Sequence, residues 1–206
     1  MTNFIIEKQY QSPVIGLDEV GRGPLAGPVV SCGCIFYSYI NEKKYKNLIL
    51  DSKKLSLKKR KLAFDLLVKL KKDKIINFYL GMASVEEIDV LNIIEATKLS
   101  MKRVVNKFKI NNPVLIIDGN FQLKYKNLIE KTVVKGDQKS ISIAAASIIA
   151  KVHRDRLMNM LSTKYQNFHW DKNAGYGTKK HIEELKRKGP TKYHRQSFEP
   201  IKSMIN

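Results

Sequence analysis

The stretch VIGLDEVGRGPLAGPVV at residues 14–30 decides the fold. Residues 14–20 form a short apolar run that is interrupted only by two adjacent acids, and GRGPLAGP at 21–28 then supplies turn residues. Residues 29–37 are rich in β-forming side chains again. The pattern therefore predicts two strands, 14–20 and 29–37, that are joined by a glycine-rich loop.

The rest of the chain continues this alternation of strands and helices. Leucines recur with helical spacing from Ser56 onward, and Ser84 with Glu87 makes a capping box that begins a helix running to about residue 107. Further strands are predicted at 75–82, 114–117 and 132–134, and further helices at 141–165 and 178–189. This order predicts an α/β fold, with a mixed sheet that carries helices on its faces.

One domain over residues 1–206 is the expected organisation. No internal repeat and no linker rich in Pro, Gly or Ser divides the chain. Within this domain we expect a core over about 14–165 and a C-terminal helical region, about 166–206, that contacts substrate. A length of 206 residues suits one core.

The apolar segments and the cysteines indicate a cytoplasmic protein. The longest nearly uncharged run, ISIAAASIIA at 141–150, is shorter than the roughly 20 residues that span a membrane, and the N-terminus has no signal-peptide pattern. Cys32 and Cys34 are too close for an easy disulfide and too few for a structural zinc site, so we interpret them as core residues. We expect a monomer without a membrane partner.

The charge of the chain favours a polyanionic partner. Thirty-eight basic and nineteen acidic residues give a net charge of +19, which would attract nucleic acid. Codon usage biased toward A/T would also enrich lysine, and a lysine-rich helix face is commonly just solvated. A non-catalytic, basic nucleic-acid-binding protein is therefore one open alternative.

Four carboxylates stand where strands end. Asp18 and Glu19 interrupt the first apolar strand, Asp118 closes the strand at 114–117, and Asp137 follows the strand at 132–134. Each acid taken alone has an ordinary explanation as a turn or capping residue. Together they would repel strongly unless a hard divalent cation neutralised them, which predicts Mg²⁺ or Mn²⁺.

An acid cluster that holds two cations about 4 Å apart is a common device for phosphodiester cleavage. Competing chemistries have less support. The four histidines make no metal-binding spacing, and neither a nucleophile elbow nor a Walker loop is present. The residues alone thus predict a metal-dependent phosphodiester enzyme.

At this point the sequence resembles a known family, ribonuclease HII. The segments that carry the resemblance are IGLDEVGRGPLAGPVV at 15–30, DSKKLS at 51–56, EEIDVLNIIEAT at 86–97, LIIDGN at 115–120, KGD at 135–137, AAASIIAKVHRD at 144–155 and GYGTKKH at 175–181. They span about residues 14–200. The resemblance implies the ribonuclease H fold and a cytoplasmic endonuclease that cuts the RNA strand of RNA–DNA hybrids. Its substrates would include duplex DNA that contains a single ribonucleotide.

The resemblance also implies roles for individual residues. Asp18, Glu19, Asp118 and Asp137 match the catalytic acids that hold two metal ions, with Asp137 completing the second site. Gly21, Arg22 and Gly23 match a loop that reads the ribose 2′-hydroxyl, where glycine lets the backbone approach the sugar closely. Cleavage 5′ to the ribonucleotide would leave a 3′-hydroxyl and a 5′-phosphate.

Three further residues are candidates for substrate binding. Tyr176 matches a tyrosine that stacks on the sugar after the ribonucleotide, and Lys53 and Lys151 would meet phosphates. For the two lysines, local packing or simple solvation is an equally good interpretation. The family often has a proline after the tyrosine, whereas this chain has Gly177, which we expect to loosen the loop and weaken recognition of the junction.

A ribonuclease HIII-like enzyme that acts only on continuous hybrids is the second alternative. That family carries an additional N-terminal domain and lacks the GRG loop. This chain has the loop and only thirteen residues before the first predicted strand, which favours ribonuclease HII.

Overall fold

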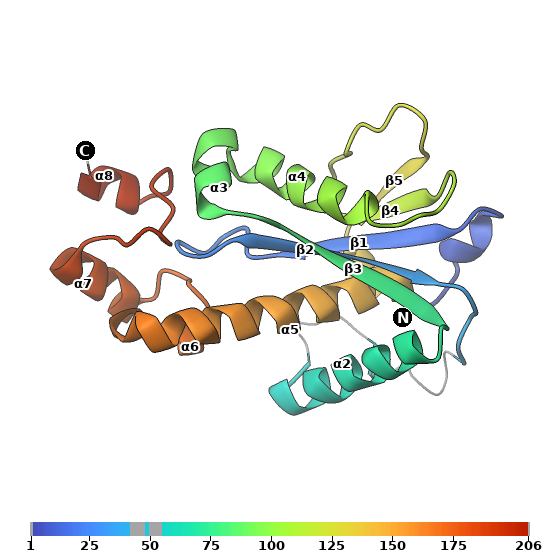
Figure 1. Ribbon diagram of the computed structural model, residues 1–206, viewed down its shortest axis with the longest axis horizontal. Helices are drawn as coiled ribbons and strands as arrows, with labels where there is room; N and C mark the ends of the chain where they lie inside the picture. The colour runs from blue at the N-terminus through green and yellow to red at the C-terminus, as the bar shows by residue number, and fades with distance from the viewer. Residues whose placement is uncertain (1, 42–47, 50–54, 206) are drawn as a thin grey trace.

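A five-stranded mixed sheet forms the centre of the protein (Figure 1). The computed structural model describes residues 2–41, 48–49 and 55–205. The strands are β1 (Val14–Val20), β2 (Val29–Phe36), β3 (Ile76–Ala83), β4 (Val114–Asp118) and β5 (Glu130–Val133). Their order is β3-β2-β1-β4-β5, with β1 antiparallel to β2 and parallel to β4. The predicted α/β class is confirmed.

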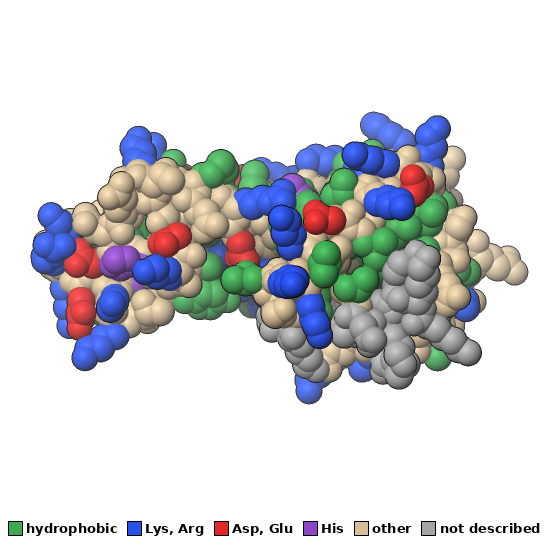
Figure 2. Space-filling view, turned by 90° about the horizontal axis from the view of Figure 1, so that it is seen from below, with side chains coloured by type: hydrophobic (Ala, Val, Ile, Leu, Met, Phe, Trp, Pro, Cys, Tyr) green, Lys and Arg blue, Asp and Glu red, His purple; other side chains and the backbone are tan. Residues whose placement is uncertain are grey.

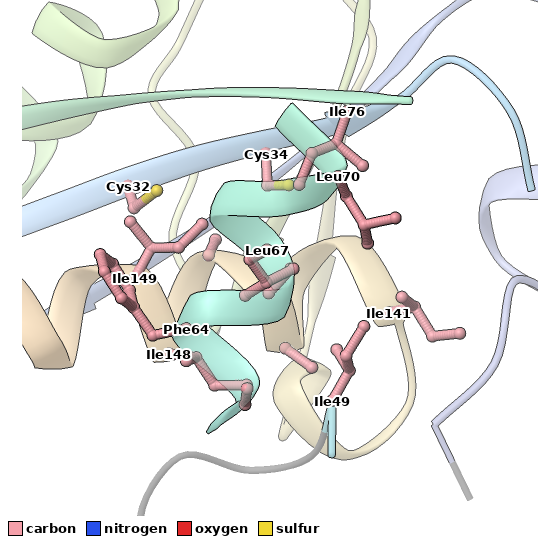
Figure 3. Close-up of a cluster of buried hydrophobic side chains, with 14 of the residues drawn as sticks. Cys32, Cys34, Ile49, Phe64, Leu67, Leu70, Ile76, Ile141, Ile148 and Ile149 are labelled. Carbon is pink, nitrogen blue, oxygen red and sulfur yellow. The ribbon is translucent and has the colours of Figure 1, made fainter. Parts of the chain in front are cut away.

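Helices cover both faces of this sheet. Helices α2 (Leu57–Lys72) and α5 (Ile141–Lys164) lie on one face, and α3 (Val85–Leu91) and α4 (Ile93–Val105) lie on the other (Figure 1). The buried side chains of α2 and α5 pack with Cys32 and Cys34 of β2 in one apolar cluster (Figure 3). Both cysteines are fully buried free thiols, as the core interpretation predicted.

The alternation of side chains along β1 decides which residues face α5. Ile15 and Leu17 pack in the cluster with α4. Gly16 lies on the opposite face, where an added Cβ would come within 2.5 Å of Ser142 and Ile143 backbone atoms. Asp18 shares the face of Gly16 because side chains two residues apart point the same way. The close packing at Gly16 therefore brings α5 down onto the strand that carries Asp18.

The continuous helix predicted from residue 84 to about 107 is wrong. The structure has two helices, α3 and α4, that meet at Asn92, whose φ of 69° is left-handed. The Asn92 side chain accepts hydrogen bonds from the N–H groups of Ile94 and Glu95, and so begins the second helix. The predicted capping box of Ser84 and Glu87 is present.

The C-terminal region packs against the loop between β1 and β2. It contains η3 (Gln166–Phe168), α6 (Trp170–Asn173), α7 (Lys179–Lys188) and α8 (Ile201–Ile205). Helix α7 begins after Thr178 and ends at Gly189, as predicted, whereas α6 and α8 were not predicted. A third apolar cluster joins the loop residues Leu25 and Ala26 to Trp170 of α6.

Basic side chains cover the outer edge of β3. Lys71, Lys107 and Arg103 donate to the carbonyl oxygens of Phe78, Leu80 and Met82 at 2.7, 2.6 and 2.8 Å. These carbonyls belong to alternate residues of a strand that has a partner on only one side. Within the described ranges, no helix combines the length and the apolarity that crossing a membrane requires.

Candidate active site

Two of the predicted acids lie where the pairing of two neighbouring parallel strands stops: Asp118 is the last residue of β4, and Asp18 lies two residues before the end of β1. The register of β1 and β4 pairs Leu17 with Ile117, and Asp18 and Asp118 each follow that pair. Parallel strands end at the same edge of the sheet, so both carboxyl groups leave the sheet at one place. The apolar run that makes each strand is thus also what brings its acid to this edge.

The Asp18 carboxyl group is buried among other negative charges. Its side chain is 5 % exposed. Burial, followed by repulsion from Glu19 and Asp118, raises the pKa of Asp18 well above its usual value. Hydrogen bonds from the Ser147 side chain and the Glu19 N–H oppose this rise. Ser147 of α5 therefore supports the site from the helix side.

Glu19 points toward the loop that follows β1. One of its carboxylate oxygens, Oε1, lies 3.3 Å from a guanidinium nitrogen of Arg22. The Arg22 guanidinium also lies over the ring of Phe121, 5.6 Å from its centre. The second residue of the GRG loop is therefore held close to the acids, with its side chain partly exposed.

Asp137 is connected to this edge of the sheet through its neighbour Gly136. The Gly136 N–H donates to Oδ1 of Asp118 at 2.7 Å, which ties the short helix η2 (Gly136–Gln138) to the end of β4. Asp137 follows in the chain and is 8 % exposed. The structure thus brings Asp18, Glu19 and Asp118 together and places the backbone next to Asp137 beside Asp118, whereas a place for the Asp137 carboxylate in the same site stays a prediction.

The acids are neighbours without forming a closed metal centre. Over residues 2–41, 48–49 and 55–205, no three His, Cys, Asp or Glu side chains are spaced to hold an ion. The chemistry of the donors nevertheless suits a hard divalent cation, because the site offers carboxylate oxygens that repel one another. A bound cation would relieve the repulsion that raises the pKa of Asp18. The residues therefore fit the predicted Mg²⁺ or Mn²⁺.

Two buried arginines organise the loop of residues 21–28. Arg195 donates to the carbonyl oxygens of Gly21, Arg22 and Gly27, the Arg22 contact being 2.8 Å. Arg154 of α5 donates to the carbonyl oxygens of Pro28 at 3.0 Å, Ala26 at 3.0 Å and Ala174 at 2.8 Å. Both side chains are fully buried. Burial lowers the pKa of Arg154 to about 10 and that of Arg195 to about 9, so both stay cationic at neutral pH.

The same arrangement explains the first glycine of the GRG loop. Gly21 has a φ of 92°, and a Cβ there would lie 2.1 Å from Nε of Arg154. Gly23 is different, because its Cβ would meet only the Tyr176 ring at 3.6 Å. The glycine at 21 is thus needed for the fold of the loop, whereas Gly23 faces the space beside Tyr176.

Tyr176 lies next to the GRG loop although 153 residues separate it from Gly23 in the chain. Its side chain is 47 % exposed. The Leu25 N–H donates to the Gly175 carbonyl at 2.8 Å, which fixes the two segments together. In the part of the chain that the structure describes, the N–H groups of Arg22 and Gly23 donate to no other residue, so both remain available to a ligand.

Lys151 sits one helical turn from Ser147, on the same side of α5. Its Nζ lies 2.7 Å from Oδ1 of Asp155, which also pairs with Arg60 of α2 at 3.6 Å. Local ion pairing therefore accounts for the position of Lys151, and contact with a phosphate stays a prediction. Lys53 lies outside the described residues.

The predicted looseness around Gly177 finds no support in the neighbouring hydrogen bonds. The Tyr176 carbonyl accepts from the Thr178 N–H at 2.8 Å and contacts Nδ1 of His181 at 2.8 Å. Gly177 itself packs closely on Leu25, where an added Cβ would lie 2.8 Å from a side-chain carbon. Weaker recognition of the junction remains a prediction.

Sequence reasoning missed the buried polar residues behind this loop, namely Arg154, Arg195, His181 and His194. Arg154 and His181 lie inside segments that carried the family resemblance. Apart from lying in these segments, they carried no signal in the sequence, because one arginine among 38 basic residues does not stand out. Their importance follows from burial, which only the folded chain shows.

Comparison with known proteins places this site in a family. Residues 15–201 match the family described as ribonuclease HII. A ribonuclease HII of Macrococcus caseolyticus is 47% identical over 201 residues, covering 97% of this chain and 72% of the relative. A ribonuclease HII of a Wolbachia endosymbiont of Brugia malayi is 44% identical over 203 residues, covering 97% and 94%.

Solved structures agree with this result. Ribonuclease HII of Archaeoglobus fulgidus, solved in a complex with PCNA, superposes with a TM-score of 0.71 at 26% identity, covering 91% of this chain and 95% of the other. Ribonuclease H2 of Pyrococcus horikoshii gives 0.69 at 26% identity, covering 93% and 96%. The chain therefore has the ribonuclease H-like fold, belongs to the ribonuclease HII family and is a metal-dependent endoribonuclease.

Proposed function

We propose that this enzyme, which acts on the RNA strand of RNA–DNA hybrids, also nicks duplex DNA at single embedded ribonucleotides. The cut falls on the 5′ side of the ribonucleotide and leaves a 3′-hydroxyl and a 5′-phosphate. The observation that carries the proposal is the position of the Tyr176 ring, which an added Cβ on Gly23, in the loop that follows the strand bearing Asp18, would approach to 3.6 Å. The loop and the ring that would recognise one sugar thus lie next to the acids that would act on its phosphate.

The acids would hold the metal. Asp18, Glu19 and Asp118 are the proposed main ligands, and Asp137 completes the set. When bound, two divalent cations would supply an activated water and neutralise charge on the leaving oxygen. Gly136 and Ser147 contribute by orienting Asp118 and Asp18 with hydrogen bonds.

The loop would read the sugar through its backbone. Because Arg195 binds the carbonyl oxygens of Gly21 and Arg22, the loop is fixed with the N–H groups of Arg22 and Gly23 left for a ligand. A 2′-hydroxyl can accept from such groups, and Tyr176 offers an exposed ring for stacking on the next sugar. Figure 2 shows Lys and Arg side chains spread over the face that carries α2 and α5, with acids between them, a surface that suits a nucleic-acid partner.

The test compares three labelled duplexes in Mg²⁺, in Mn²⁺ and with a chelator. The duplexes carry one ribonucleotide, a continuous RNA–DNA hybrid strand, or DNA alone. We expect metal-dependent cleavage of the first two, with a single nick 5′ to the ribonucleotide. Cleavage of the hybrid alone would support the ribonuclease HIII-like alternative, and binding without cleavage would support the non-catalytic one.

A further inference from the structure

A chain of hydrogen bonds runs beneath Tyr176 through two buried histidines. Nδ1 of His181 lies 2.8 Å from the Tyr176 carbonyl oxygen, and Nε2 of His181 lies 3.0 Å from Nε2 of His194. Trp170 donates from Nε1 to Nε2 of His181 at 3.2 Å. The rings of His181 and His194 are 0% and 1% exposed. None of these residues belongs to the acid site.

Groups that can only donate or only accept fix the direction of this chain. The Thr191 N–H donates to Nδ1 of His194 at 2.9 Å, so this nitrogen carries no proton. In neutral His194 the proton is then on Nε2, from which it is donated to His181. His181 accepts there from Trp170 as well, so its own proton is on Nδ1 and is donated to the Tyr176 carbonyl, which can only accept.

Both imidazoles are held neutral. Burial lowers the pKa of His181, and burial together with repulsion from His181 lowers the pKa of His194 to about 3. A proton added to Nε2 of His181 would face the N–H groups of both Trp170 and His194. The five hydrogen-bonded groups therefore allow one arrangement of protons at neutral pH.

His194 also contacts the GRG loop, through its backbone. It forms a β-bridge with Ala26, flanked by hydrogen bonds from Gly27 N–H to the Tyr193 carbonyl and from Arg195 N–H to the Leu25 carbonyl, both 2.9 Å. The His194 backbone thus binds loop 21–28, and its side chain is connected through His181 to Tyr176. His194 thus adds a second connection between loop 21–28 and Tyr176, beside the direct hydrogen bond from the Leu25 N–H to the Gly175 carbonyl.

We propose that His181 and His194 are positioning residues that set Tyr176 against loop 21–28 and thereby give the enzyme its selectivity for a single ribonucleotide in DNA. The inference rests on the proposed function. The two histidines therefore affect which substrate the enzyme prefers only by positioning Tyr176, and they contact neither substrate nor metal.

The first test uses the unmodified protein. Long-range ¹H–¹⁵N correlation spectra of its imidazoles at pH 7 report which ring nitrogen carries the proton. We expect Nδ1–H for His181 and Nε2–H for His194. The opposite tautomer in either ring, or a cationic ring, would overturn the hydrogen-bond chain.

The second test measures a selectivity ratio, the kcat/KM for the single-ribonucleotide duplex divided by that for the continuous hybrid. His194→Phe keeps an aromatic ring but breaks the chain, and should lower the ratio about fivefold. His194→Gln, which can keep an N–H at the place of Nε2, should recover part of this loss. With Tyr176→Ala already present, His194→Phe should change the ratio by less than about twofold, since the two residues act as a unit.

The matched control is Phe168→Leu. Phe168 packs on both imidazoles, with ring centres 5.6 and 4.7 Å away, but its side chain takes no part in the hydrogen bonds. This variant should lower stability and leave the ratio within about twofold of the unmodified protein. An equal loss in Phe168→Leu and His194→Phe would reduce the histidines to packing residues and overturn the proposal.

The outcomes separate this inference from the proposed function. If the unmodified enzyme fails to cut the single-ribonucleotide duplex, the proposed function is wrong. If it cuts that duplex and Tyr176→Ala lowers the ratio while His194→Phe does not, only the positioning role is wrong.

Discussion

The acid site and the loop that we propose reads the sugar lie side by side, yet their electrostatics differ in kind. At the acid site, burial and then repulsion from Glu19 and Asp118 raise the pKa of Asp18. Behind the loop, two buried guanidinium groups have their hydrogen bonds met by backbone carbonyls. The acid site gathers like charges that a cation would neutralise, whereas the charges behind the loop are hydrogen-bonded within the chain.

This difference separates the region that would cleave the phosphodiester bond from the region that would recognise the sugar. A site that must gain and lose metal benefits from acids that are close but not closed around an ion. A loop that recognises sugars benefits from a backbone that is fixed before the substrate arrives, because less conformational entropy is then lost on binding. Substitutions in the two regions should therefore have effects that differ as much as their contacts imply.

The largest effect is expected for Asp18→Asn. Removing a proposed metal ligand should lower kcat at least about a thousandfold, roughly 4 kcal/mol of transition-state stabilisation. The free energy of unfolding of the metal-free protein should not fall, because the substitution removes a buried negative charge beside Glu19 and Asp118. Cleavage assays and urea unfolding check both parts, and a protein that fails to fold would make Asp18 structural instead.

Arg154→Met should show the reverse pattern, in which stability is lost first. The carbonyl oxygens of Pro28, Ala26 and Ala174 would lose their donor, at a cost of about 3 kcal/mol in the free energy of unfolding. Arg154→Lys should recover little, since an ammonium cannot span three carbonyls. Arg156→Met, on the exposed side of the same helix, is the control and should change stability by less than about 1 kcal/mol.

The two glycines of the GRG loop should respond differently. Gly21→Ala places a Cβ on the Arg154 side chain at a positive φ and should lower the free energy of unfolding by about 2 kcal/mol. Gly23→Ala adds only an ordinary contact with Tyr176 and should leave stability within about 0.5 kcal/mol. Any loss of cleavage in Gly23→Ala would then reflect a narrower space for the sugar. Equal destabilisation by the two changes would mean that the loop is not held as described.

Acid should weaken the region behind the loop through His194. Its pKa is about 3 in the folded protein and about 6.5 when unfolded. As pH falls below about 6.5, the unfolded chain takes up a proton that folded His194 does not, so stability declines until the pH reaches the folded pKa. This residue alone contributes a loss of about 1.4 kcal/mol at pH 5.5. Urea unfolding between pH 5 and 7 measures the slope, which His194→Gln should flatten; an unchanged slope would contradict a buried neutral imidazole.

The same contrast between the two regions explains which features could be predicted from the sequence. The acids were predictable because a carboxylate inside an apolar strand is costly, and so Asp18 and Asp118 stood out. The strands β1 and β2 were predictable from the apolar runs that flank the GRG loop. Asn92 was missed as a helix boundary because the apolar spacing continues across it, and only its left-handed φ separates α3 from α4.

The buried bases could not be found in this way. Arg154 and Arg195 are two of 38 basic residues, and nothing local distinguishes a guanidinium that binds loop carbonyls from one in water. His181 and His194 have no metal spacing, and their contact is made by folding α7 against the segment that follows it. The approach of Gly23 to Tyr176 is likewise a product of tertiary structure. Polar groups paired inside the fold leave no pattern along the chain.

The capped edge of β3 has a consequence for the protein in a crowded solution. An unpaired strand edge is a template on which another chain can add a strand, and continued addition leads to aggregates. Lys71, Arg103 and Lys107 occupy the carbonyl oxygens that such a strand would need and place positive charge there. Part of the net charge of +19 therefore disfavours the addition of another strand at this edge of the sheet, a role that neither codon usage nor nucleic-acid binding would predict.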